Sequence, residues 1–304
     1  MYSFSTCWNS HRHTDGRAML REIRELGFEY AELSHGIRLS LVPGILEAVD
    51  AGEIKISSLH NICPLPIGVL QAAPNLYEFS AGEDLDRQLA VKHTLKTFEF
   101  AARVKAPIVV LHLGSIQMKD YTGKLSKLLE ADGKISAKFE KLRAEALKTC
   151  EAKKEKFFAR LKETLRQILP DAEKRGLKLG CENRQALEEL PLDGDYENFL
   201  AEFDRPGIAY WHDTGHAQIK ENFGVLQHAK FLETLAPRLA GFHVHDVIAP
   251  ADDHSAPGTG TIDFAALKPF VKPQHIKVFE LSPSLQADAV KDGIAHIKKI
   301  WGEE

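Results

Sequence analysis

The sequence predicts an α/β protein, a single (β/α)₈ TIM barrel that spans residues 1–304. Three observations support this prediction. Eight short β-rich runs alternate with helical stretches, which implies right-handed crossovers and a parallel sheet. Several of these runs are almost continuously apolar, as expected for strands that are buried on both faces. Finally, eight strand–helix units in about 300 residues fit a closed barrel.

The first half of the chain supplies four strands with their helices. The helix after Asp15 has apolar residues at helical spacing and ends at Gly27. Further helices are expected at residues 41–51 and 84–104. The expected strands are residues 2–7, 30–34, 54–60 and 107–114.

The second half continues the alternation after a longer connection. A polar segment at residues 115–135, which contains two glycines, is interpreted as a loop insertion before a long helix at residues 135–174. In residues 208–216 a strand leads into a turn. The other strands are expected at 177–184, 239–246 and 275–282, and the other helices at 195–203, 225–236, 263–271 and 285–300.

The sequence lacks the signature of the main alternative fold, an open doubly wound sheet. Such a sheet usually carries a glycine-rich phosphate-binding turn after its first strand. The segment "STCWNSHRH" contains no glycine. We therefore expect no nucleotide cofactor.

The composition indicates a soluble protein, with 44% hydrophobic and 27% charged residues. The four cysteines show no Cys-x-x-Cys spacing and are expected to be reduced thiols, which favours a cytoplasmic location. No apolar run reaches the roughly 20 residues that span a bilayer, and residues 1–16 contain no signal-peptide-like apolar region. No membrane partner is expected, and homo-oligomerisation stays open.

The charge distribution disfavours nucleic acid as a partner. The net charge is −4, and residues 116–176 hold 16 Lys and Arg against 10 Asp and Glu. On a long helix, such an excess is typical of a solvated face. A strongly basic surface, on which nucleic-acid binding depends, is not evident elsewhere.

Metal-ligand residue types stand at the same end of six consecutive strands. In a (β/α)₈ barrel the C-terminal strand ends meet at one mouth, so residues far apart in sequence become neighbours. Imidazole and carboxylate ligands together suit Zn²⁺, Mn²⁺, Co²⁺ or Fe²⁺, whereas an all-oxygen set favours Mg²⁺ or Ca²⁺. The six residues are His60, His112, Glu182, Asp213, His243 and Glu280.

Two of these carboxylates end otherwise apolar runs, Glu182 in "LKLGCE" and Glu280 in "IKVFE". Burial of an unpaired carboxylate costs several kcal/mol, so each needs a cation or a base beside it. A single His or Glu at a strand end is commonly a structural residue. The coincidence over six strands favours a metal centre and disfavours a binding protein without catalysis.

The motifs that carry these residues resemble a known family. "GCENR", "YWHDTGHA", "FHVHD" with "DDHSAPGTGTIDF", and "VFELS" are similar to segments of the xylose isomerase-like barrel superfamily. That superfamily contains sugar-phosphate isomerases and epimerases, and the apurinic endonuclease called endonuclease IV. The resemblance covers almost the whole chain, and "WHDTGHA" is among its most specific parts.

The resemblance implies a divalent metal site, with Mn, Co or Zn favoured over Mg. The implied ligands are Glu182, Asp213, His243 and Glu280. Some relatives hold further metal ions, so the number of ions stays open. The positions that match additional ligands are His60, His112, His216, Asp252 and His254.

Four side chains are candidates for contact with a substrate. Arg184 lies on the same side of its strand as Glu182, and its guanidinium suits hydroxyls, a carboxylate or a phosphate. His216 matches a position that contacts substrate in the epimerases. Glu32 reaches the substrate or orients a ligand histidine, and His245 reaches the substrate or bonds a loop.

The predicted function is a metal-dependent isomerase or epimerase of a small carbohydrate: a sugar, a sugar phosphate or a keto-polyol. As the resemblance to ketose 3-epimerases implies, Glu182 and Glu280 are expected to remove and return a proton next to a carbonyl. Two alternatives stay open. A lyase or dehydratase on a keto-inositol or oxidised sugar begins with the same proton abstraction, and an endonuclease IV-like zinc phosphodiesterase uses the same ligands.

Overall fold

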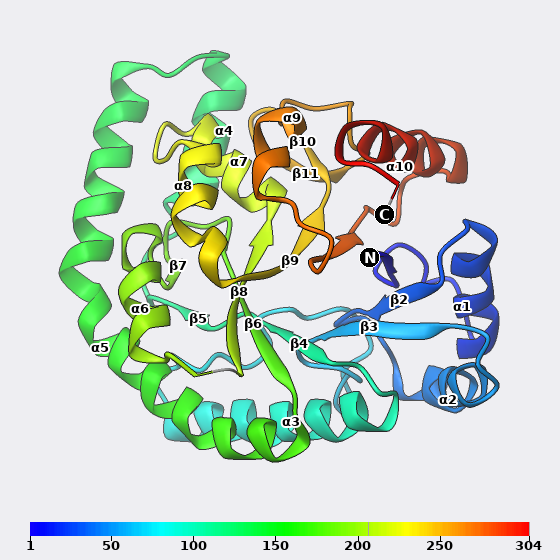
Figure 1. The fold of residues 1–304 in the computed structure, drawn as a ribbon. Helices are drawn as coiled ribbons and strands as arrows, with labels where there is room; N and C mark the ends of the chain where they lie inside the picture. The colour runs from blue at the N-terminus through cyan, green and yellow to red at the C-terminus, as the bar shows by residue number, and fades with distance from the viewer. Residues whose placement is uncertain (206, 304) are drawn as a thin grey trace.

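Eight parallel strands close into a barrel in the computed structural model, which describes residues 1–205 and 207–303 (Figure 1). Neighbouring strands pair in parallel in the order β1-β12-β9-β8-β6-β4-β3-β2, and the predicted barrel fold is thereby confirmed. The barrel strands are β1 (Tyr2–Ser5), β2 (Tyr30–Leu33), β3 (Lys55–His60), β4 (Ile108–Leu111), β6 (Lys178–Glu182), β8 (Ile208–Asp213), β9 (Leu239–Val244) and β12 (Ile276–Phe279).

Helices surround the barrel, and the long α5 forms one flank of the molecule in Figure 1. This helix begins at Ser136, whose side chain accepts a hydrogen bond from the Phe139 N–H, and ends at Gly176 in the left-handed region. The helices are α1 (Gly16–Glu25), α2 (Val42–Asp50), α3 (Asp84–Arg103), α4 (Thr122–Asp132), α5 (Ala137–Arg175), α6 (Tyr196–Glu202), α7 (Thr214–Asn222), α8 (His228–Leu235), α9 (Phe264–Leu267) and α10 (Ala287–Trp301).

The apolar core has an inner and an outer part. The larger part includes the residues between the strands and the surrounding helices. Inside the barrel, Trp211 packs with a few aliphatic side chains: Ile108, Val110, Ile276 and Val278. A Cβ atom on Gly180 or Gly241 would press against the Trp211 side chain, so the two glycines make room for it. The barrel interior is therefore a packed core rather than a channel.

Two helices lie where the sequence suggested none. The segment 115–135, expected as a loop insertion, contains α4, and the Glu188 carboxylate accepts hydrogen bonds from the N–H groups of Tyr121 and Thr122 at its start. After β8, the expected turn is the first part of α7, for which Asp213 is the N-cap. Helix α7 is rich in polar residues and lacks a clear apolar period. Helix α4 has Leu125, Leu128 and Leu129 at helical spacing, but the two glycines of the segment, at positions 123 and 133, favoured a loop.

Two short antiparallel strand pairs lie beyond the ends of the barrel strands. β5 (Gly114–Ser115) pairs with β7 (Glu189–Leu190), and β10 (Asp246–Ile248) pairs with β11 (Asp252–Ser255). The Asp246 carboxylate anchors the loop after β11, because it accepts hydrogen bonds from four backbone N–H groups: those of Val247, Gly258, Gly260 and Ile262. The segment "APGTGTI" therefore has a structural role, because its backbone N–H groups hold the loop against the Asp246 carboxylate.

Candidate metal centre

The register of the barrel brings four side chains together at the carboxyl ends of the strands. Asp213 on β8 lies beside His243 on β9, Glu182 is the last residue of β6, and Glu280 follows β12. One ligand atom from each of the four lies within 4.8 Å of the others, and all four residues are buried. The residues implied as metal ligands by the sequence therefore meet in space.

His243 lies at the centre of this group. Its Nδ1 is 2.7 Å from Glu182 Oε1 and 3.1 Å from Glu280 Oε2, and its Nε2 is 3.1 Å from Glu32 Oε2. Burial disfavours the protonated ring, but the charges of Glu280, Glu32 and Glu182 outweigh it and hold the pKa of His243 well above its usual value. Metal-bound histidines commonly donate their other N–H to a carboxylate. Glu32 fits that position, which leaves Nδ1 as the ligand atom.

Glu182 has one oxygen atom without a hydrogen-bond donor. Although burial opposes ionisation, the positive charge of His243 holds the pKa of Glu182 well below its usual value. Its buried Oε2 accepts no hydrogen bond from any described residue. The Nε2 of His112 is 2.8 Å away but itself accepts from Arg184 Nη1 at 2.7 Å, so it has no proton to offer. The nearby His60 Nε2 lies at 3.4 Å.

This donor set fits a divalent metal ion. An ionised, buried oxygen that lacks a donor costs several kcal/mol unless a cation lies beside it. Three carboxylates and one imidazole converge on the same point, which is the mixed set that suits Mn²⁺, Co²⁺ or Zn²⁺. The residues Glu182, Asp213, His243 and Glu280 therefore fit the group that the resemblance implies.

Asp213 is held in place by two hydrogen bonds, one to each carboxylate oxygen. Its Oδ1 accepts from the backbone N–H of His216 at 2.7 Å, as the N-cap of α7. Its Oδ2 lies 3.0 Å from Nε2 of His245. Because His245 Nδ1 accepts from the backbone N–H of His254 at 2.9 Å, the ring hydrogen is on Nε2 and points to Asp213. The orientation of this carboxylate is therefore fixed before any ligand binds.

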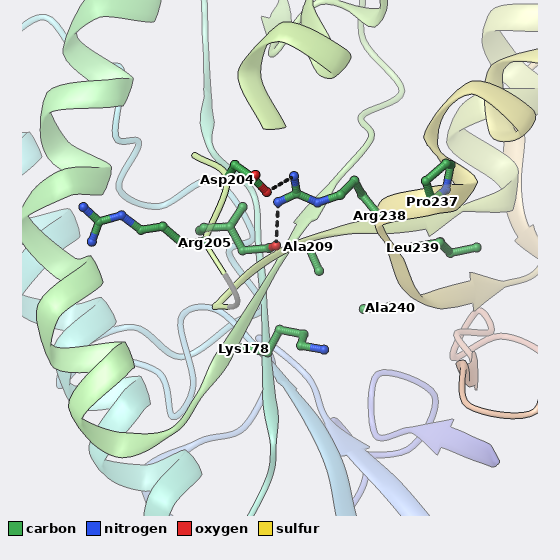
Figure 2. A pocket seen from close by; sticks show the side chains of 9 residues that line it. Lys178, Asp204, Arg205, Ala209, Pro237, Arg238, Leu239 and Ala240 are labelled. Carbon is green, nitrogen blue, oxygen red and sulfur yellow. Dashed lines mark hydrogen bonds and ion pairs between the residues drawn. The ribbon is translucent and has the colours of Figure 1, made fainter. Parts of the chain in front are cut away.

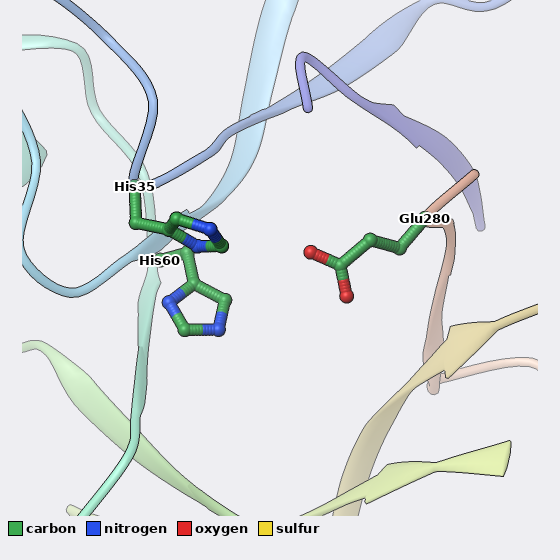
Figure 3. A group of neighbouring side chains, drawn as sticks. All are labelled: His35, His60 and Glu280. Carbon is green, nitrogen blue, oxygen red and sulfur yellow. The ribbon is translucent and has the colours of Figure 1, made fainter. Parts of the chain in front are cut away.

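A second group of possible ligands adjoins the first. His60, at the end of β3, joins Glu182 and His243 in one group and His35 and Glu280 in another. Figure 3 shows the rings of His35 and His60 side by side, with the Glu280 carboxylate facing them from the other side. The two rings are 4.8 Å apart and nearly perpendicular.

A third group comes from α7 and β11. His216, Asp253 and His254 bring one ligand atom each within 4.8 Å. The expectation for Asp252 differs from this finding, because Asp252 is exposed and pairs with Ile248 across the hairpin. The carboxylate beside His254 belongs to Asp253, one residue further along.

Arg184 lies in a buried polar cluster at the edge of the mouth. Its Nε donates to Glu189 Oε1 at 3.1 Å, and its Nη1 donates to His112 Nε2. His112 in turn donates from Nδ1 to Asn75 Oδ1 at 2.9 Å. Burial, followed by the charge of Arg184, holds the pKa of His112 well below its usual value, so the ring is neutral. His112 therefore contacts Glu182 and Arg184, and stands outside the ligand groups described above.

Two residues expected to contact substrate lie behind the ligands instead. Glu32 and His245 are both fully buried. Glu32 holds Nε2 of His243, and His245 holds Asp213. Neither side chain has a surface that a substrate at the mouth can reach. Their geometry is that of residues that orient metal ligands, which was the alternative for Glu32.

The family model described as a xylose isomerase-like TIM barrel matches residues 20–300. The chain belongs to this family. No curated protein matches the sequence. Among the described residues of this xylose isomerase-like barrel, every helix is too short or too polar to span a bilayer.

Solved structures show the same fold at low sequence identity. A D-tagatose 3-epimerase-like protein has a TM-score of 0.68 and 19% identity, with 98% of each chain covered. The 3-keto-D-glucoside 4-epimerase from E. coli has a TM-score of 0.69 and 14% identity, also with 98% of each chain covered. D-allulose 3-epimerase from Methylomonas sp., in complex with D-allulose, has a TM-score of 0.66 and 14% identity over 98% of this chain and 96% of that one.

Three residues of the xylose isomerase-like site were missed by the sequence analysis: His35, Asp253 and Glu189. His35 follows β2 at the mouth, so its place two residues beyond Leu33 was a usable signal. Asp253 follows Asp252, the residue that the resemblance implied as a ligand. Glu189 had no signal in the sequence, because its position beside Arg184 depends on the pairing of β5 with β7, which are far apart along the chain.

Cavities lie at both ends of this xylose isomerase-like barrel. One of about 420 Å³ adjoins the ligand groups, and its lining includes His35, Ser34, Cys7 and Arg38. Another, of about 500 Å³, lies at the opposite end, where β6, β8 and β9 begin (Figure 2). There Arg238 donates to Asp204 and to the Ile208 carbonyl. None of the ligand-type residues of the mouth lines this second cavity, so its position separates it from the candidate metal centre.

Proposed function

We propose that the chain is a metal-dependent sugar isomerase or epimerase that removes a proton from a carbon next to a carbonyl. The observation that carries this proposal is the convergence of Glu182, Asp213, His243 and Glu280 at the barrel mouth. The fold likeness to proteins named as 3-epimerases and a 4-epimerase of sugars supports the choice of substrate class. The proposed substrate is a small carbohydrate.

The proposed metal site is the four-residue group, with Mn, Co or Zn as the ion. Such an ion, when bound, supplies Lewis-acid stabilisation of the negative charge that develops on the oxygen atoms of the substrate. His243 presents Nδ1 to the site while Glu32 accepts from Nε2. The side chain of His245 keeps Asp213 oriented.

Glu182 and Glu280 are the proposed acid/base pair. Glu182 is ionised, because the charge of His243 outweighs the cost of burial and lowers its pKa, and only an ionised carboxylate can accept a proton. Glu280 comes from the opposite part of the barrel wall, since β12 and β6 are separated by β9 and β8. The two carboxylates therefore approach a substrate from different sides, as removal and return of a proton on two faces requires.

Arg184 and His216 are the proposed substrate contacts. Both lie next to Glu182 and are almost buried. Arg184 uses Nε and Nη1 for Glu189 and His112, and no described residue accepts from its Nη2 in a hydrogen bond. A guanidinium edge of this kind recognises hydroxyl or acidic oxygens.

The sugar epimerases among the structural neighbours favour isomerisation or epimerisation over the two alternatives. A lyase shares the proton abstraction, and its distinguishing step, loss of a leaving group, depends on the substrate. A zinc phosphodiesterase depends on a basic face for nucleic acid. The net charge of −4 does not favour that partner.

The test is hydrogen exchange on a panel of ketoses and keto-polyols. Incubation with metal-loaded protein in D₂O should place deuterium on the carbon next to the carbonyl of the true substrate. Glu182→Gln and Glu280→Gln should each abolish this exchange, whereas Glu163→Gln, on the exposed side of α5, should not. Metal content measured for each variant separates loss of the base from loss of the ion. Full exchange in Glu182→Gln or Glu280→Gln would contradict the assignment.

A further inference from the structure

The mouth of the barrel holds more negative charge than one divalent ion can balance. Four buried carboxylates converge there: Glu32, Glu182, Asp213 and Glu280. The guanidinium of Arg184 lies 3.1 Å from Glu189 and 3.6 Å from Glu182, so its single positive charge balances only one of these two carboxylates. Buried charges require compensation, and their desolvation costs several kcal/mol each. With Glu189 counted, five carboxylates face one guanidinium, and a single divalent ion at the four-residue site leaves two negative charges unbalanced.

His60 presents an unused lone pair to this region. Its Nδ1 donates to the Asn61 carbonyl at 3.1 Å, so its Nε2 carries no hydrogen when the ring is neutral. This Nε2 faces Glu182 Oε2 at 3.4 Å, a contact between two acceptors unless a cation or a proton lies between or beside them. His60 is therefore arranged as a metal ligand through Nε2.

His35 adds a second imidazole from a different segment. It follows β2, and its Nδ1 is buried without a hydrogen-bond partner among the described residues. Together with His60 and Glu280, it places one ligand atom within 4.8 Å of the others. Figure 3 shows that the three side chains come from three separate segments and face a common space. A buried, unpartnered nitrogen at this place is explained by a ligand that the protein itself does not supply.

The group also has a route to solvent. His35 lines the cavity of about 420 Å³ whose other walls include Ser34, Cys7 and Arg38. Glu280 has two carboxylate oxygens, and Oε2 is 3.1 Å from His243 Nδ1 in the four-residue group. One carboxylate can therefore serve both groups, one oxygen for each.

We propose that His35, His60 and Glu280 bind a second divalent cation, of the zinc or cobalt type, next to the ion of the four-residue site. Two imidazoles and one carboxylate match the ligand set of three-residue zinc sites, in which a fourth position stays open for water or a substrate oxygen. Glu280 bridges the two ions. His35 matches none of the positions that the family resemblance implied, so the site is assigned from its geometry. The proposal goes beyond the proposed function, for which one ion suffices.

The test is the number of metal ions bound per chain. Metal-free protein is titrated with zinc chloride by isothermal titration calorimetry, and the reconstituted, desalted protein is measured by elemental analysis. The wild type should bind two ions in this part of the molecule. His35→Gln should lose one equivalent and retain the other. His11→Gln is the matched control, because His11 is exposed, lines the same cavity and belongs to no ligand group.

A replacement ligand gives an independent readout. Cysteine binds zinc and cobalt well, so His35→Cys should restore the lost equivalent. With Co²⁺ it should also give a sulfur-to-cobalt charge-transfer band that the wild type and His11→Cys lack. Circular dichroism and thermal unfolding check that each variant is folded.

The outcomes are distinct. An unchanged metal count in folded His35→Gln would overturn the proposal. A wild type that binds only one ion would also overturn it, yet would leave the proposed isomerase or epimerase function intact. A wild type that binds two ions but exchanges hydrogen on none of the ketoses or keto-polyols of the panel would overturn the proposed function and leave the second metal site in place.

Discussion

Nε2 of His245 donates to Oδ2 of Asp213 at 3.0 Å, and the backbone N–H of His254 donates to Nδ1 of the same ring. The two contacts fix the tautomer and the direction of the imidazole. They also leave His245 with no role at the surface, since it is fully buried. The ring therefore acts through Asp213, as a group that positions a proposed metal ligand.

The first prediction concerns this hydrogen bond. His245→Ala should lower the affinity of the four-residue site for zinc by about 10–100-fold, the usual effect of losing a partner that orients a ligand. Calorimetric titration of metal-free protein measures it. The exposed His11→Ala is the control and should not change the affinity. Equal zinc affinities in wild type and folded His245→Ala would contradict the positioning role.

The second prediction concerns Gly215, at the start of α7. A Cβ atom there would overlap Cε1 and Nδ1 of His245. Gly215→Ala should therefore displace the ring, reproduce the affinity loss of His245→Ala, and destabilise the fold by about 1–3 kcal/mol through overpacking. Gly194→Ala is the control, since nothing lies within 4 Å of a Cβ at that position. Urea unfolding and zinc titration measure the two effects, and a Gly215→Ala protein with wild-type zinc affinity would be inconsistent with this packing.

The third prediction concerns the buried pair of Arg184 and Glu189. Burial opposes both charges, and each partner holds the other in its ionised form, with the pKa of Glu189 lowered and that of Arg184 raised. Arg184→Met alone should destabilise the protein by about 3–5 kcal/mol, because it leaves a buried carboxylate unpaired. The double variant Arg184→Met/Glu189→Gln should recover much of this loss. The measurement is a double-mutant cycle in which urea unfolding gives the free energy of unfolding of each variant. Strictly additive losses of this free energy would show that Arg184 and Glu189 are not coupled.

The fourth prediction concerns pH and His228. Burial lowers its pKa from 6.5 to about 4, and its Nδ1 donates to Gln218 while its Nε2 meets Nε2 of His212 at 2.9 Å. Between pH 6.5 and about 4 the unfolded chain therefore binds a proton that the folded chain does not, so stability falls as the pH is lowered through this window. The contribution of His228 is about 3 kcal/mol in total.

Urea unfolding of metal-free protein at pH 7, 6, 5 and 4 measures this effect. His228→Gln should show a shallower loss of stability between pH 7 and pH 4 than the wild type, whereas His11→Gln should follow the wild-type curve. Parallel curves for the wild type and His228→Gln would show that another group causes the acid sensitivity.

The barrel and the four-ligand group were predictable because two simple patterns carry them. Apolar runs mark the strands, and a charged residue at the end of such a run marks the mouth, as in Glu182 and Glu280. Parallel strands place these ends together regardless of their distance in sequence. The sequence alone was therefore sufficient to bring Asp213 next to His243.

The rest depends on contacts that no local pattern encodes. The helix α7 is almost wholly buried yet rich in polar residues, so it lacks the apolar stripe by which helices are predicted. The choice between Asp252 and Asp253 depends on the register of a short hairpin with an irregularity, which sequence does not fix. The burial of Glu32 and His245 depends on how deeply the ligand layer lies in the barrel, which only the packed structure reveals.

The Trp211 side chain closes the floor of the site, because it fills the barrel interior beneath His243, with the two ring centroids 5.3 Å apart. An ion at the proposed site would therefore arrive from the mouth rather than through the barrel interior, on the same side as the proposed sugar substrate. Under the proposed function, the ion would bind before the sugar and would leave more slowly while the sugar is bound. A chelator should therefore remove the proposed activity quickly when substrate is absent and slowly when substrate is saturating.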